Sequence, residues 1–552
     1  MTARSGAGDG QPGGAAGGDL QAWLEGDEQT RDRVYRWLVD EHADKHAHVL
    51  AESPRRRLVL LTCADAGGSG AGDLLVKHFR GGLERHRLRE ALKLRLGLTA
   101  VRREWRMLQR LWQRGLAVPR PLGRARLRDG GEILVLEYIH GRSLAEALTD
   151  SPSQKRELLT LLGRRVRELH EAGLAHRDLH IGNVHVGGDG PTLLDFQRAR
   201  RAFGRRSRLR DVGELDFSLA HHGVSCASRV RVRRSALAQT DGRLGAEERR
   251  LVRAAGRASV RRAQRYFRSR TRRSLRPGRR FARLRQAHGM RLRELPEEAV
   301  HEALAAHRAA ISQSHQSVLK HDHRARVSAV QTAGRRIIVK EVVKRGHLRQ
   351  LADLVRGSAG RRAWLGGHGL QARGVAAATP LAFVELRRMG LPLRSTVLLE
   401  DVRPAEPVHE SSFARADPAA VMRALCRLAV AMHSRGALHG DFQSLHVLLA
   451  DSPAGDGEPA LRLIDLEGVR FPRRLREGDR IKALAELNAS LPDDLVPAAM
   501  RLESFRRYAR ALPFASGAHR ALREIVRQGL ARGHHWSGAA CTLAGVSRSG
   551  RR

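Results

Sequence analysis

Apolar residues in the first half of the chain form short continuous runs that predict β-strands. The runs Arg55–Ala64 (RRRLVLLTCA) and Asp73–Phe79 (DLLVKHF) predict two adjacent strands, and the Gly-rich segment between them predicts a hairpin turn. A third run, Gly131–Ile139 (GEILVLEYI), predicts a buried strand. Near the N-terminus, Gln21–Leu24 and Val34–Val39 carry apolar residues at helical spacing and predict helix.

Further along, one stretch combines a strand–turn–strand pattern with three polar residues at fixed distances. In His176–Phe196 (HRDLHIGNVHVGGDGPTLLDF), Asp178 precedes Asn183 by five residues and Asp195 by seventeen. A helical run ends just before it, and VHV and TLLDF predict short strands. This order is typical of kinases, in which the first Asp aligns an acceptor hydroxyl while the Asn and the second Asp bind Mg²⁺. An isolated HRD would be unremarkable in so basic a chain, but the three spacings together favour a kinase site.

Two further residues fit the nucleotide-binding part of such a site. Lys77 lies at the end of an apolar strand, like the kinase lysine that holds the phosphates of ATP. Glu104 belongs to the following helical segment, where its carboxylate is expected to pair with Lys77; a solvated helix face is the alternative. Glu137 ends the strand before the expected hinge, where backbone groups would bind adenine. The turn that covers the nucleotide is expected near Ala51–Arg55, although that segment has no GxGxxG motif.

The second half of the chain repeats these features in register. Val327–Val343 (VSAVQTAGRRIIVKEVV) again predicts two strands and a turn, and it contains Lys340. The segment LHGDFQSLHVLL supplies Asp441, and LRLIDLEGVRF supplies Asp465 as a metal ligand. The lysine and the loop aspartate are 101 residues apart in both halves, and Glu400 repeats the hinge glutamate at the common offset of 263 residues. Because two chance matches would not keep this register, the sequence predicts a tandem duplication.

The repeat defines the expected fold and its division into domains. We expect an α+β protein with two tandem bilobal protein-kinase-like domains, each with an antiparallel-sheet N-lobe and a helical C-lobe. A length of 552 residues suits two domains. The expected boundaries are a disordered Gly/Ala-rich segment over residues 1–18, a first domain over 19–285 and a second over 286–552.

The two halves differ at positions that matter for catalysis. Ala363 stands at the position of the helix glutamate, so Lys340 has no obvious carboxylate partner. Glu341 would point to the opposite face of its strand, and Asp353 on the next helix is the remaining candidate. His446 replaces the asparagine at the metal position. We therefore expect the first domain to be the better catalyst, and the second to be a slower kinase or a regulatory or acceptor-binding pseudokinase.

Charge and composition narrow the choice of partners. The formal net charge is +43, and only eight of the 101 basic residues are lysines. A GC-rich genome can produce such an arginine bias, but the resulting field still attracts phosphates, anionic lipid surfaces and nucleic acid. Aromatic residues make up only 4% of the chain, which leaves few stacking platforms, so no specific nucleic-acid partner is expected.

The spacing of the cysteines and the lack of long apolar runs both favour a reducing, cytoplasmic environment. The cysteines are widely separated and form no CxxC motif, so neither a zinc site nor a disulfide framework is expected. The chain has no run of eighteen apolar residues and no apolar signal segment near its start, so a cytoplasmic location is expected. The four cysteines are Cys63, Cys226, Cys426 and Cys541.

These motifs resemble one known family. HRDLHIGNV with LLDFQ, and HGDFQSLHVLL with LIDLEGV, are similar to motifs of the lipopolysaccharide kinases of the Kdo/WaaP type, and the similarity extends from about Arg55 onward. The resemblance implies a protein-kinase-like fold without a strict Gly-rich loop, and some members carry His at the metal position of Asn183. It also implies ATP- and Mg²⁺-dependent phosphorylation of a sugar hydroxyl in lipopolysaccharide core, with an anionic glycolipid or sugar as acceptor. The resemblance places this reaction at the inner face of the cytoplasmic membrane, where the protein would bind peripherally. The tandem arrangement departs from single-domain members.

Two other classes of protein remain open. The first is a Ser, Thr or Tyr protein kinase, although no APE-type segment lies at the usual distance after Asp195. The second is a binding protein, such as a pseudokinase or a basic scaffold. Against it, the first half retains every charged group that phosphoryl transfer requires.

Overall fold

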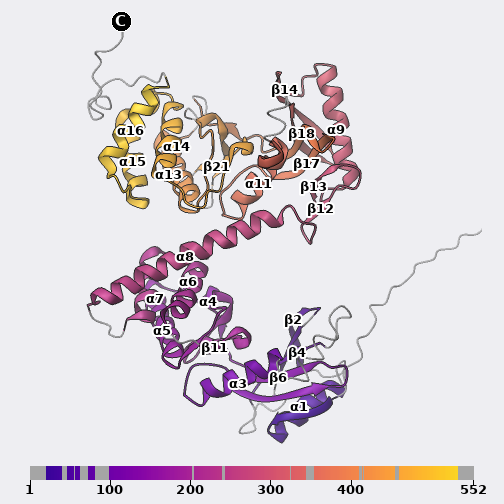
Figure 1. Ribbon diagram of the computed structural model, residues 1–552, viewed down its shortest axis with the longest axis vertical. Coiled ribbons are helices and arrows are strands. Elements are labelled where there is room, and N and C mark those ends of the chain that lie inside the picture. Colours follow the sequence, from indigo (N-terminus) through magenta and orange to yellow (C-terminus); the bar gives the residue numbers. More distant parts are fainter. Residues whose placement is uncertain are drawn as a thin grey trace, which may run out of the picture. The chain divides into compact units, whose positions relative to one another are not determined.

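Figure 1 shows the computed structural model of the chain, which divides into two compact units, Met1–Arg262 and Ala263–Arg552. The expected disordered segment over residues 1–18 and most of the Gly-rich turn before Lys77 lie outside the described residues. The structure describes residues 20–39, 46–54, 56–62, 72–80, 99–201, 204–238, 243–323, 325–343, 353–409, 413, 416–453 and 459–532.

A six-stranded antiparallel sheet forms the N-lobe of the first unit, with the strand order β1-β5-β6-β4-β3-β2. The three strands expected from apolar runs are present as β3, β4 and β6. The helix expected over Gln21–Leu24 is wrong, because these residues form the edge strand β1, where pairing with β5 outweighs a short helical period. The strands are β1 (Leu20–Gly26), β2 (Ala47–Ser53), β3 (Arg56–Leu61), β4 (Leu74–Phe79), β5 (Pro121–Leu127) and β6 (Glu132–Glu137).

Alternation along these strands determines what each face of the sheet contacts. One helix covers each face of the sheet. Ile133 of β6 belongs to the hydrophobic cluster on one face, and its neighbour Leu134 belongs to the cluster on the other face. In β4, Val76 belongs to the first cluster, so Lys77 points to the opposite face. The two covering helices are α1 (Glu28–Val39), on the Val76 face, and α3 (Ala100–Trp112), on the Lys77 face.

The C-lobe of the first unit is mainly helical and carries three short strand pairings. Helix α5 (Pro152–Glu171) begins with Pro152 at a position where a proline costs no hydrogen bond, and Ser151 caps it. The β9–β10 hairpin lies between the two halves of the HRD–N–D motif. The elements are β7 (Arg142–Ser143), α4 (Leu144–Ala147), α5 (Pro152–Glu171), β8 (Leu174–Ala175), β9 (Val184–Gly187), β10 (Gly190–Leu193), β11 (Arg200–Arg201), α6 (Arg205–His221) and α7 (Cys226–Leu237). Helix α8 (Ala246–Arg273) begins in the first unit and ends in the second.

The second unit has a seven-stranded antiparallel sheet in the order β12-β13-β17-β18-β16-β15-β14. The two strands expected over Val327–Val343 are present as β15 and β16. Helices α9 (Glu297–Ser312) and α11 (Ala359–Gln371) pack against this sheet. The strands are β12 (Phe281–Arg283), β13 (His288–Leu292), β14 (Val318–His321), β15 (Ala325–Thr332), β16 (Arg335–Val343), β17 (Pro380–Arg388) and β18 (Leu391–Glu400).

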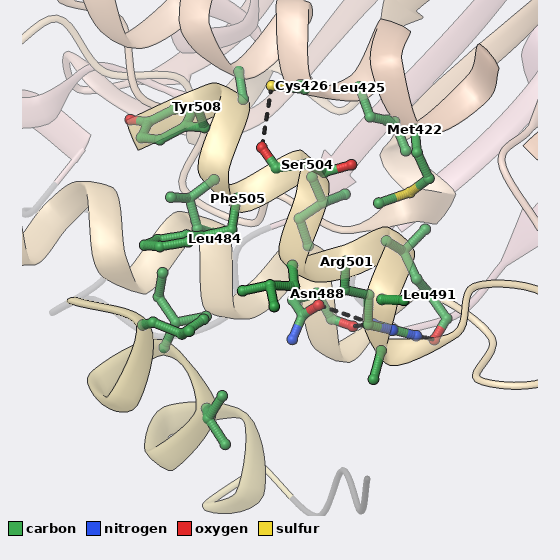
Figure 2. A pocket seen from close by; sticks show the side chains of 18 residues that line it. Met422, Leu425, Cys426, Leu484, Asn488, Leu491, Arg501, Ser504, Phe505 and Tyr508 are labelled. Carbon is green, nitrogen blue, oxygen red and sulfur yellow. Dashed lines mark hydrogen bonds between the residues drawn. The ribbon is translucent and has the colours of Figure 1, made fainter. Parts of the chain in front are cut away.

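The helical lobe of the second unit contains an apolar cavity of about 300 Å³ that is partly open to solvent and lined by residues such as Met422, Leu425 and Phe505 (Figure 2). None of the residues that the sequence nominates for catalysis lines it. Among the described helices, none has the length and apolar content needed to cross a bilayer. The elements are β19 (Glu406–Pro407), α13 (Pro418–Ser434), β20 (Val447–Pro453), β21 (Pro459–Leu463), α14 (Glu477–Ala489), α15 (Ala498–Ala511) and α16 (Ala518–Leu530).

Candidate active site

Lys77 and Glu104 form a buried ion pair on the α3 face of the first sheet. Lys77 Nζ lies 2.6 Å from Glu104 Oε1, and the two residues are 6% and 0% exposed. Helix α3 begins after Thr99, whose side chain accepts a hydrogen bond from the backbone of Arg102 and so fixes the first turn. The expected pairing is therefore present, and the alternative of a solvated helix face for Glu104 is wrong.

The loop that carries Asp178 is held by two buried side chains. Asp211 Oδ2 accepts from the backbone N–H of His176 at 2.7 Å, and its Oδ1 accepts from that of Arg177 at 2.9 Å. Arg177 has a φ of 66°, an uncommon value for a residue with a side chain, and the carboxylate holds the backbone there. Burial lowers the pKa of His176, so its neutral ring donates from Nε2 to Leu194 O at 2.9 Å.

The β9–β10 hairpin brings the two candidate metal ligands of the first unit together. Leu194 N donates to Asn183 O at 2.9 Å, so the residue before Asp195 is bonded directly to the asparagine. Asn183 Nδ2 donates to Asp178 O at 2.9 Å, which leaves its Oδ1 as the atom that could bind a cation. Asp195 has a left-handed backbone with a φ of 62°. An amide oxygen and a carboxylate fit a hard cation such as Mg²⁺.

Two arginines that the sequence did not single out contact the candidate carboxylates. Arg198 Nη1 lies 3.3 Å from Asp178 Oδ1, and Arg56 Nη1 lies 3.5 Å from Asp195 Oδ2. Arg56 begins β3, directly after the turn expected to cover the nucleotide. Their positions next to the predicted nucleotide turn and the metal loop could have pointed to them. In a chain with so many arginines, however, such positions are not distinctive. Both guanidiniums add positive charge where phosphate groups would bind.

In the second unit, Lys340 pairs with the metal loop. Its Nζ contacts Asp465 Oδ1 and lies 3.6 Å from Glu467 Oε1. Burial opposes the charge on Lys340, but Glu467 and Asp465 raise its pKa, and the same pairing outweighs burial to lower the pKa of Asp465. Asp353 is not the partner of Lys340, because the lysine contacts Asp465 and Glu467 and Asp353 Oδ1 lies 3.2 Å from the guanidinium of Arg362.

The catalytic loop of the second unit has the same internal bonds as the first. His446 Nδ1 is 2.8 Å from Asp441 O, and His439 Nε2 is 3.0 Å from Ile464 O. One ligand atom from each of Asp441, His446 and Asp465 lies within 4.8 Å of the others. Two carboxylates and an imidazole are a donor set that fits a divalent cation.

The two hinge glutamates occupy equivalent strand ends but present exposed or half-exposed side chains. Glu137 N donates to Arg120 O at 2.9 Å, and Glu400 N donates to Thr379 O at the same distance. Glu400 also lies 3.6 Å from Arg462. Both residues therefore bond to the sheet through their backbone.

Taken together, an antiparallel sheet with a buried Lys–Glu pair and a helical lobe with an HRD–N–D loop define a protein with a kinase-like fold. The profile of the Lipopolysaccharide kinase (Kdo/WaaP) family matches residues 40–235 and 336–503. These ranges cover more than half of the chain, and the chain belongs to this family and is a kinase.

The chain is similar to several 3-deoxy-D-manno-octulosonic acid kinases and to a KEOPS complex subunit. The 3-deoxy-D-manno-octulosonic acid kinase of Xanthomonas axonopodis pv. citri (strain 306) is 32% identical over 176 residues, or 28% of this chain and 68% of that protein. That of Xanthomonas campestris pv. campestris (strain B100) is 30% identical over 203 residues, or 33% of this chain and 79% of that protein. The KEOPS complex subunit Bud32 of Pyrococcus abyssi is 35% identical over 115 residues, which are 20% of this chain and only half of its own length.

Among solved structures, WaaP in complex with acyl carrier protein aligns with a TM-score of 0.32 and 20% identity. The alignment covers 46% of this chain and 99% of WaaP. An aminoglycoside-3'-phosphotransferase of type VIII aligns with a TM-score of 0.28 and 16% identity, over 42% of this chain and all of that protein.

Proposed function

We propose that the chain transfers the γ-phosphoryl group of ATP, with Mg²⁺, to a sugar hydroxyl of lipopolysaccharide core or of a related anionic glycolipid. The observation that carries this proposal is the buried Lys77–Glu104 pair in a chain whose loop also presents Asp178, Asn183 and Asp195. The sugar acceptor is supported by the similarity to kinases named for 3-deoxy-D-manno-octulosonic acid.

In this mechanism, each side chain of the first unit has one electrostatic task. Lys77, oriented by Glu104, binds the α- and β-phosphates. Asn183 and Asp195 would hold Mg²⁺, which neutralises charge on the phosphate oxygens when bound. Asp178 accepts the hydroxyl proton while the acceptor oxygen bonds to the γ-phosphorus and the bond to the β,γ-bridging oxygen breaks, releasing ADP. Most of the rate gain comes from positioning and fixed charge.

The acceptor is expected to be anionic. Arg56 and Arg198 lie at the two candidate carboxylates, and both side chains are at least one-third exposed. Guanidinium groups bind phosphate and carboxylate oxygens in a bidentate manner, so they suit a phosphorylated or acidic sugar. The net charge of +43 favours peripheral binding at an anionic membrane surface.

We also propose that the two units are duplicated kinase-like domains, with the first as the main catalyst. The common offset of 263 residues and the matching loop bonds of Asn183 and His446 support the duplication. In the second unit Lys340 is bound to Asp465, the candidate metal ligand. Because Ala363 stands at the position of Glu104, Lys340 has no carboxylate on the helix and binds the metal-loop aspartate instead, which supports a slower or regulatory second domain.

ATP turnover by the full chain tests the proposal. Wild type, Asp178→Asn and Asp441→Asn are compared with Mg²⁺ and core oligosaccharide that contains 3-deoxy-D-manno-octulosonic acid, and separately with casein as a generic protein acceptor. Loss of the order of 10²- to 10⁴-fold in Asp178→Asn is expected, with a small effect of Asp441→Asn. Phosphate on casein but never on sugar would favour a protein kinase, and absence of ATP turnover would overturn the proposal.

A further inference from the structure

The two units place a carboxylate near their nucleotide lysines by opposite means. The first unit has Glu104 on the helix and Gln197 two residues after its metal-loop aspartate. The second has Ala363 at the helix position and Glu467 two residues after its aspartate. Relative to the first unit, the second unit has lost an acidic residue on the helix and gained one in the metal loop. This pattern is expected if the role of pairing with the lysine has passed from the helix to the loop.

The geometry of the second unit agrees with this exchange. Lys340 Nζ lies 3.6 Å from Glu467 Oε1, and the lysine side chain is 21% exposed. Ala363 is 4% exposed and ends in a methyl group, which cannot pair with an ammonium. In the part of the chain that the structure describes, Glu467 and Asp465 are the carboxylates that contact Lys340.

The other acids near Lys340 are used elsewhere. Glu341, on the opposite face of β16, has its carboxylate oxygens 3.6 Å from Arg326 and 3.9 Å from Arg394. Asp353 pairs with Arg362. Neither is positioned to take the place of Glu467.

We infer that Glu467 is the positioning residue of Lys340, and that it performs in the second unit the task of the helix glutamate in the first. The inference rests on the proposed function, because it requires nucleotide binding by the second unit. Asp465 alone is not enough, since a cation bound with the nucleotide would compete with Lys340 for that carboxylate. Glu467 would then keep the ammonium in place for the triphosphate.

Helix α11 supports Glu467 through its backbone rather than by supplying a carboxylate to Lys340. Arg362 Nε donates to Glu467 O at 3.3 Å, so the helix holds the backbone of the positioning residue. The helix lies so close to this turn that a Cβ on Gly366 would come within 2.4 Å of Leu466 O. The lysine of the second unit is therefore coupled to the metal loop, whereas Lys77 is coupled to helix α3.

Nucleotide affinity of the full chain tests the inference. All variants are made in a parent protein that carries Asp195→Asn, so that nucleotide binding by the first unit is weakened. This substitution replaces a carboxylate by an amide of similar size and leaves no cavity. Binding of ATP with Mg²⁺ is measured by titration calorimetry. The double variant Asp195→Asn/Lys340→Ala defines the background, because it lacks the nucleotide lysine of the second unit. Adding Glu467→Gln is expected to weaken binding roughly 10- to 100-fold, and Glu467→Asp less. Adding Ala363→Glu to Glu467→Gln is expected to restore most of the affinity.

Two outcomes would overturn the inference, and a third would overturn the proposed function. Equal affinity of the Glu467→Gln and parent proteins would overturn the inference and leave the proposed function intact. No binding by the Asp195→Asn protein, with binding by Asp465→Asn, would also overturn it, because the second unit would then have no nucleotide site. No binding by wild type would overturn the proposed function itself. If Ala363→Glu loses hydrogen-exchange protection in α11, the comparison of Asp with Gln at the half-exposed position 467 decides.

Discussion

Lys77 and Glu104 are 27 residues apart in the chain, and their charged atoms lie 2.6 Å apart with almost no exposure to solvent. Strand β4 supplies the lysine and helix α3 supplies the glutamate, so the pair ties helix to sheet. Removing one partner of such a pair leaves an uncompensated buried charge, which costs far more than the net contribution of the intact pair.

Glu104→Ala is therefore expected to destabilise the N-lobe of the first unit by about 3–5 kcal/mol and to abolish the activity assigned to that unit. Hydrogen exchange in β4 and α3 measures the loss of local stability. Glu137→Ala, at an exposed position on the same sheet, serves as the control and is expected to change protection little. Unchanged exchange in Glu104→Ala would contradict the assignment of the pair as a buried tie.

Asp211→Ala is expected to lower kcat with little change in the nucleotide KM. The carboxylate is 1% exposed and accepts from two backbone N–H groups of the loop that carries Asp178. One of these donors is buried and the other is partly buried, and leaving a buried donor unpaired costs about 1–3 kcal/mol, so the loop should rearrange. Steady-state kinetics with each substrate varied separates the two parameters. Asp211→Asn keeps one acceptor oxygen and should be intermediate, and a pure KM effect would argue against a loop-holding role.

Local sequence patterns were enough to predict the pairing of Lys77 with Glu104, but not the partners of Lys340. Lys77 could be named because it lies on an apolar run that predicts a strand, and Glu104 because it lies on the helical segment that follows. The partner of Lys340 could not, since it depends on the distance between a strand and a loop 125 residues away. The four-residue segment Gln21–Leu24 fits a helix and a strand equally well, and only its pairing with β5 decides.

Arg501→Lys is expected to destabilise the helical lobe of the second unit by several kcal/mol. The guanidinium is buried at the edge of the apolar cavity, where it donates to Val496 O at 2.7 Å, Leu491 O at 2.9 Å and Asn488 Oδ1 at 2.9 Å. An ammonium is a compact donor and cannot reach acceptors spread around a planar fork, so several carbonyls would lose their partners. Urea denaturation followed by exchange in α15 measures the loss. Arg506→Lys, at an exposed position on the same helix, is the control.

Acid is expected to destabilise the second unit through His433. Its ring is 4% exposed, and burial, with help from nearby Arg480, lowers its pKa to about 3 from the ordinary 6.5. Burial raises the pKa of Tyr508 to about 12, so its hydroxyl is protonated and donates to His433 Nδ1 at 2.8 Å, while its oxygen accepts from Arg480 Nε at 2.9 Å. A proton on His433 would remove this acceptor and add a second positive charge.

Because the pKa of His433 is lower in the folded than in the unfolded protein, the unfolded state binds more protons between pH 6.5 and 3. The stabilising contribution is complete above pH 6.5 and falls by about 1.4 kcal/mol per pH unit below it. Urea denaturation at pH 8, 6.5 and 5, followed by exchange in α13, measures this slope. His433→Asn keeps an acceptor for the tyrosine but cannot titrate, so its slope should be shallower, whereas the exposed His519→Asn should keep the wild-type slope. Equal slopes in wild type and His433→Asn would show that other groups control the acid sensitivity of this lobe.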